Sequence, residues 1–251
     1  MTAQPGATSA WIRRFHPAPD AATRLVCLPH AGGAASYYFP VSRALAPDID
    51  VLAIQYPGRQ DRRNEPCLDD VRELADALAT ELKPWTGKPV TVFGHSLGAT
   101  LGFELASRLQ SDGVELLGLF ASGRRAPSRH RENESVHLSS DASLISTLKK
   151  MSGTESQFLD DDEVLQMILP AIRGDYKAAE TYRYRQGPPL ECPITVLTGD
   201  ADTEVTMDEA RAWSEHTTGA FDLRVFIGGH FYLNDHAPAV IARIAKQVAD
   251  R

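Results

Sequence analysis

Cysteine is scarce in this sequence, and its spacing suggests no structural role for it. Only three cysteines, Cys27, Cys67 and Cys192, occur among 251 residues, and no two of them form a C-x-x-C pair. An odd number without paired spacing argues against a disulfide framework and against a zinc site. Paired metal ligands at usable spacing are lacking elsewhere too, so we expect no metal and no resident cofactor.

Long apolar runs are also missing. No stretch is long enough to cross a bilayer, and residues 1–10 contain neither the basic region nor the apolar region of a secretory signal. The net charge of −7 argues against wholesale binding of nucleic acid. We therefore expect a cytoplasmic protein with neither a membrane nor a nucleic acid as partner. We also expect a monomer, although no sequence feature determines the oligomeric state.

The remaining composition, 43% hydrophobic and 24% charged, is that of an ordinary globular protein. Apolar runs typical of strands occur at 24–28, 51–55, 90–93, 115–121, 194–198 and 222–227, with a weaker edge strand at 12–15. Segments of helical spacing alternate with them, among others at 71–82, 207–215 and 237–248. This alternation predicts one α/β domain over 1–251, with a mainly parallel sheet flanked by helices.

The most informative stretch joins an expected strand to an expected helix through Gly94-His95-Ser96-Leu97-Gly98. In such a G-x-S-x-G turn the glycines leave out side chains that would clash, so that the serine can adopt a strained backbone and expose its hydroxyl. The following helix directs its positive end at the same place, which favours an anionic intermediate. We interpret Ser96 as a catalytic nucleophile and the Leu97 N–H as an oxyanion donor.

Serine is a weak nucleophile at neutral pH and needs a base, which a carboxylate in turn orients. His230 directly follows an expected strand and two glycines, so we predict that it is the base. The carboxylate is Asp200 or Asp202, which share one loop after another strand. We choose Asp202 because its spacing from Gly199 lets the turn send that carboxylate toward the histidine.

The chain order Ser96, Asp202, His230 resembles that of α/β-hydrolases. That resemblance implies a second oxyanion donor in the loop after an early strand, which here reads Pro29-His30-Ala31-Gly32-Gly33. Ala31 is the candidate, because the adjacent glycines allow the backbone to approach a substrate oxygen closely.

No strand pattern occurs between Gly123 and Pro189. Helical segments are expected there at 144–151, 164–173 and 175–182. These segments carry more apolar residues than helices exposed to solvent on all sides would need. The apolar residues are Leu144, Leu148, Met151, Leu165, Ile168 and Leu169. We interpret residues 123–189, hereafter the helical insertion, as a lid over the site, with a purely scaffolding subdomain as the alternative.

A narrower resemblance covers nearly the whole chain. The motifs that carry it are Pro29-His30-Ala31-Gly32-Gly33, Tyr56-Pro57-Gly58-Arg59, Gly94-His95-Ser96-Leu97-Gly98, Ser122-Gly123-Arg124-Arg125-Ala126-Pro127, Tyr182-Arg183-Tyr184 and Gly229-His230-Phe231. Together they resemble the type II thioesterases of polyketide and nonribosomal peptide synthetases. The resemblance implies an editing enzyme that acts in trans and removes acyl groups from the phosphopantetheine arm of acyl or peptidyl carrier proteins.

Arginines collect after several expected strand ends, although the chain is acidic overall. Arg59, Arg124 and Arg125 are candidates for docking the acidic carrier protein and its phosphate, since arginine binds phosphate through two hydrogen bonds. Other functions stay open at this point: a chain-terminating medium-chain acyl-carrier thioesterase, a general carboxylesterase, or a non-catalytic α/β-hydrolase fold that serves as a binding module.

Overall fold

The fold is built around a seven-stranded sheet with the order β1-β3-β2-β4-β5-β6-β7. The structure, a computed structural model, describes residues 9–132, 134–152 and 161–249. The strands are β1 (Ile12–Arg13), β2 (Thr23–Leu28), β3 (Ile49–Ile54), β4 (Val90–His95), β5 (Leu116–Ser122), β6 (Ile194–Gly199) and β7 (Phe221–Phe226). β1 pairs antiparallel with β3, and the other neighbouring strands pair in parallel. The carboxyl ends of the parallel strands therefore meet at one edge.

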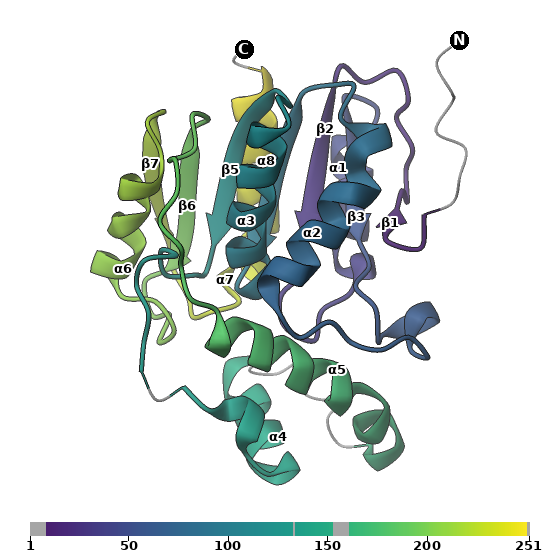
Figure 1. The fold of residues 1–251 in the computed structure, drawn as a ribbon, viewed down its shortest axis with the longest axis vertical. Coiled ribbons are helices and arrows are strands. Elements are labelled where there is room, and N and C mark those ends of the chain that lie inside the picture. The colour runs from purple at the N-terminus through teal and green to yellow at the C-terminus, as the bar shows by residue number, and fades with distance from the viewer. Residues whose placement is uncertain (1–8, 133, 153–160, 250–251) are drawn as a thin grey trace.

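Helices cover both faces of the sheet and one of its ends (Figure 1). They are α1 (Phe39–Leu45), α2 (Val71–Leu82), α3 (Leu97–Ser111), α4 (Asp141–Ser152), α5 (Asp162–Thr181), α6 (Met207–Arg211), α7 (Tyr232–Asp235) and α8 (Ala237–Ala249). The pair α2 and α3 packs on one face, whereas α1 and α8 pack on the other (Figure 1).

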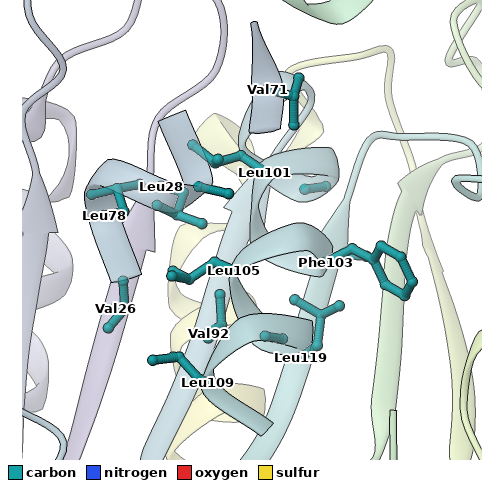
Figure 2. Close-up of a cluster of buried hydrophobic side chains, with 14 of the residues drawn as sticks. Val26, Leu28, Val71, Leu78, Val92, Leu101, Phe103, Leu105, Leu109 and Leu119 are labelled. Atoms are coloured by element: carbon teal, nitrogen blue, oxygen red, sulfur yellow. The ribbon is translucent and has the colours of Figure 1, made fainter. Parts of the chain in front are cut away.

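Successive side chains of a strand point to opposite faces of the sheet, so the apolar strands give both faces of the sheet an apolar surface. On β2, Val26 and Leu28 join the core under α2 and α3, and Leu25 and Cys27 join the core on the opposite face. Figure 2 shows the first of these cores, in which leucines of α3 lie against strand residues such as Val92. The central strands are thus buried on both sides, as expected for a parallel sheet.

The predicted fold class is confirmed, and the predicted strands agree with the observed ones to within a few residues. Two helix predictions are wrong in detail. The expected helices 164–173 and 175–182 form the single helix α5, because Gly174 continues the helix rather than ending it. The expected helix 207–215 is α6 followed by a 3-10 helix over Ala212–His216, which tightens the chain where Trp213 is buried.

The helices of the helical insertion, α4 and α5, lie together at one end of the sheet (Figure 1). They build a small apolar cluster of their own around Leu144, Leu165, Leu169 and Ile172. Of the predicted apolar positions, the side chain of Met151 lies outside the described part of the structure. Among the described helices, none has the length and apolar character that crossing a membrane requires.

Candidate active site

The turn between β4 and α3 holds Ser96 in a backbone conformation that few residues adopt. Ser96 has φ of 55° and ψ of −118°, and its N–H donates to the Ser122 carbonyl at 2.8 Å. A Cβ atom on Gly94 would lie 1.9 Å from the Gly98 carbonyl oxygen, and one on Gly98 would lie 2.2 Å from that of Leu28. Both glycines are therefore required by close backbone contacts, as the sequence pattern predicts.

The loop after β7 brings His230 to a carboxylate in the loop after β6. The Nδ1 atom of His230 lies 3.1 and 3.0 Å from the two carboxylate oxygens of Asp202, and both side chains are almost fully buried. Asp202 also accepts the N–H of Glu204 at 2.9 Å, which fixes the carboxylate. Asp200 is exposed and instead accepts the N–H of Gly228 at 2.9 Å. The geometry thus favours Asp202 over Asp200 as the partner of the histidine.

Ser96 and His230 line one cavity of about 400 Å³, together with Ala31 and Leu97. Leu97 is the first residue of α3, so its N–H has no acceptor within the helix. Among the residues that the structure describes, no hydrogen bond joins the Ser96 hydroxyl to His230. Catalytic contacts of this type are often long until substrate binds.

Two further histidines lie near His230, of which His95 is fully buried and His30 is half-buried. The ring centroids of His95 and His230 are 4.9 Å apart, and those of His30 and His95 are 5.9 Å apart. His95 is hydrogen-bonded through Nδ1 to the Ser122 hydroxyl at 2.8 Å. Burial lowers the pKa of His95 well below its usual value, and burial, aided by the charge of His230, lowers the pKa of His30 to about 4. Both rings are therefore neutral at neutral pH.

Two of the three predicted docking arginines are not at the surface. Arg59 is only 8% exposed and forms two hydrogen bonds with Asp175 of α5, at 2.6 and 2.8 Å. Arg125 is 5% exposed and is paired in the same two-pronged manner with Glu134. This differs from the expected exposed rim, because each guanidinium is already paired with a carboxylate of the same chain, the buried Asp175 for Arg59 and the partly exposed Glu134 for Arg125.

Arg124, the third, lines the active-site cavity. Its guanidinium donates to the Thr100 hydroxyl at 3.1 Å and to the Ala179 carbonyl at 3.0 Å. Within the described ranges no carboxylate forms an ion pair with it. Burial, followed by the charge of Arg125, lowers the pKa of Arg124 to about 10, so that it still carries its charge at neutral pH.

The sequence analysis missed Asp175. Its carboxylate is 1% exposed and accepts the N–H of Gly32, in the candidate oxyanion loop, at 2.7 Å. A signal was present in the sequence, since Asp175 falls on the same helical face as the apolar residues Ile168 and Ile172. A carboxylate on an apolar face is buried and needs a partner.

Comparison with known proteins defines the class. The thioesterase domain family model matches residues 23–248. The chain therefore belongs to the thioesterase family and is a thioester hydrolase, which confirms the resemblance found in the sequence motifs.

Individual relatives are similar over most of their length. The chain is 52% identical to the thioesterase PikA5 of Streptomyces venezuelae over 90% of this chain and 80% of the relative. It is 49% identical to a probable cadicidin biosynthesis thioesterase of Streptomyces griseus, over 98% and 68%. The solved structure of the type II thioesterase BorB, from the borrelidin biosynthetic cluster, superimposes with a TM-score of 0.92 at 56% identity, covering 96% of this chain and 98% of that one.

Proposed function

We propose that this protein is a serine thioesterase that removes acyl groups from the phosphopantetheine arms of carrier proteins and so edits a polyketide or nonribosomal peptide synthase in trans. The observation that most supports this chemistry is that Ser96 lines the same cavity as His230, which forms a buried pair with Asp202. The relatives supply the substrate class, since BorB is a type II thioesterase of a biosynthetic cluster. The enzyme works in the cytoplasm as a monomer, with no metal or cofactor of its own.

The residues divide the reaction into two steps. In the first, His230 takes the Ser96 proton as the hydroxyl oxygen attacks the thioester carbonyl carbon. The C–S bond then breaks, the thiol leaves with the proton from His230, and the acyl group stays on Ser96. In the second, His230 takes a proton from water as the water oxygen attacks the acyl carbonyl carbon. The bond between that carbon and the Ser96 oxygen then breaks, His230 returns its proton to Ser96, and the carboxylic acid leaves. Asp202 orients His230 and stabilises its cation throughout.

The negative charge that develops on the carbonyl oxygen needs fixed donors. Leu97 at the start of α3 and Ala31 in the loop after β2 line the same cavity as Ser96. Their N–H groups are our candidates for these donors. Neither requires a side chain to move, because both donors belong to the backbone.

The helical insertion supplies much of the opposite wall. The cavity is lined there by Thr147 and Leu148 of α4 and by Ile168, Ile172 and Tyr176 of α5. These side chains support our interpretation of residues 123–189 as a lid that selects the acyl chain.

For Arg124 we propose contact with the bound substrate inside the cavity, in place of docking the carrier protein at the surface. We propose that its guanidinium donates hydrogen bonds to a polar group of the bound substrate. It lines the cavity and forms no ion pair with the described carboxylates. Replacing it by methionine is expected to raise KM for an acyl-pantetheine thioester about tenfold, the equivalent of a lost hydrogen bond to a charged group. The matched control is Arg129→Met, which removes a half-exposed arginine paired with Glu215 and should leave KM unchanged.

The proposed function is tested by mixing purified enzyme with acyl-loaded carrier protein and following the carrier mass. We expect loss of the acyl group with retention of the phosphopantetheine arm, at a rate far above that on a simple oxygen ester of the same acid. Faster hydrolysis of the oxygen ester would favour a carboxylesterase. Release confined to medium chains would favour a chain-terminating enzyme, and no turnover of either substrate would favour a binding module.

A further inference from the structure

The loop that carries Ala31 is tied at both of its ends to the segment after β3. The Tyr56 hydroxyl donates to the Pro29 carbonyl at 3.1 Å. The Gln55 side-chain oxygen accepts the N–H of Ala35 at 2.9 Å. The positions of residues 29 and 35 are therefore set by the sheet.

The middle of the loop is held by the buried pair of Arg59 and Asp175. One carboxylate oxygen of Asp175 accepts the N–H of Gly32 at 2.7 Å, and Arg59 donates to the Gly33 carbonyl at 3.2 Å. The same Asp175 oxygen lies 2.6 Å from Arg59, so that pair and loop form one hydrogen-bonded unit. Two successive residues after Ala31 are thereby fixed.

Asp175 brings this contact from the helical insertion. A second residue of α5, Ile172, packs so closely on the loop that a Cβ atom on Gly32 would lie 2.9 Å from it. Gly32 also has φ of 76°, a conformation that favours glycine. The residue directly after the candidate oxyanion donor is thus in contact with α5 through a hydrogen bond and through packing.

We propose that Asp175 and Arg59 are positioning residues that aim the Ala31 N–H at the reacting oxygen, so that the oxyanion hole is complete only while α5 is seated on the loop. This inference rests on the proposed function, since it takes Ala31 as an oxyanion donor. Removing one such donor costs a hydrolase about 10²- to 10³-fold in kcat, which is the size of effect at stake.

The Arg59–Asp175 pair contributes hydrogen bonds of fixed direction to the loop and adds little to the free energy of unfolding. Taking two charges out of water costs about as much as their attraction returns, and an apolar pair of similar volume is often as stable. The double variant Arg59→Met with Asp175→Leu is therefore expected to fold while losing the hydrogen bonds to Gly32 and Gly33. The variant Asp175→Asn, which keeps the volume of the side chain, serves as an independent second case.

The test compares kcat and KM on p-nitrophenyl acetate with the affinity for two inhibitors. An acyl trifluoromethyl ketone forms an anionic adduct with the serine, whereas a thioether analogue of the substrate binds without forming charge. We expect kcat to fall about 100-fold in the double variant and about tenfold in Asp175→Asn, with KM changed less than threefold. Affinity for the ketone should fall in parallel, and affinity for the thioether should stay unchanged.

The matched control is Lys177→Met, which breaks the half-exposed ion pair between α5 and Asp69 at 2.6 Å. It should leave all four quantities unchanged. If kcat stays within threefold of the wild type in both Asp175 variants, or if both inhibitors weaken equally, the positioning role is wrong. Failure of the wild type on carrier-bound thioesters would instead overturn the proposed function, because the ester assay does not depend on the carrier.

Discussion

Nδ1 of His230 lies about equally close to both carboxylate oxygens of Asp202, at 3.1 and 3.0 Å, while Asp200, two residues earlier, holds a turn instead. Asp202→Asn should therefore leave a folded enzyme whose histidine is in the wrong tautomer, with kcat reduced about 10³- to 10⁴-fold. Asp200→Asn should cost less than threefold, because the amide oxygen can still accept the Gly228 N–H. Steady-state kinetics of both variants decide between them, and a larger loss from Asp200→Asn would reverse the assignment.

The two apolar sets of the helical insertion should respond differently to substitution. Ile168 lines the cavity, so Ile168→Phe should shift the preference toward shorter acyl chains with little change in the free energy of unfolding. Leu144 is fully buried in the insertion's own cluster. Leu144→Ala should cost about 2 to 5 kcal/mol with chain preference unchanged. The measurements are urea unfolding and kcat/KM across a series of acyl thioesters.

Equal destabilisation by both substitutions, with no change in chain preference, would support the scaffolding alternative for residues 123–189.

Burial of neutral His30 makes stability depend on pH. Its pKa is lowered to about 4 in the folded protein, whereas an unfolded histidine titrates near 6.5. Between these values the unfolded chain binds the additional proton, so the free energy of unfolding is highest above about pH 6.5 and falls as pH is lowered. For this one residue the loss from pH 7 to pH 5 is on the order of 2 kcal/mol.

Urea unfolding at pH 7 and pH 5 checks this expectation, with His30→Gln as the comparison. The variant should lose less stability than the wild type over this interval. An equal loss in both proteins would mean that His30 is not held neutral by the fold.

Local patterns were sufficient to predict most of the fold. Each apolar run and the G-x-S-x-G turn is a signal contained within a few consecutive residues. The strands, the turn at Ser96 and the position of His230 after a strand could therefore be predicted from the sequence. The continuity of α5 through Gly174 could not be predicted, because glycine is a weak helix former and the local sequence favours a break there.

The arginines show where sequence reasoning stops. Arg59 and Arg125 occur in loops after strands, as exposed docking residues would. Whether such a residue meets solvent or a carboxylate depends on partners 116 residues away for Arg59 and nine residues away for Arg125. Ion pairs between distant segments leave no periodic signal, so the Arg59–Asp175 unit emerges only from the folded structure.

The measurement that tests the central claim most directly is the location of the acyl group during turnover. Wild-type enzyme is mixed with acyl-loaded carrier protein, quenched in acid within milliseconds and mapped by peptide mass spectrometry, beside a folded Ser96→Ala variant. We predict the acyl mass on the peptide that contains Ser96, its absence from the variant, and a loss of hydrolysis in the variant of at least 10³-fold. An acyl group on another residue, or near wild-type hydrolysis by Ser96→Ala, would contradict the account.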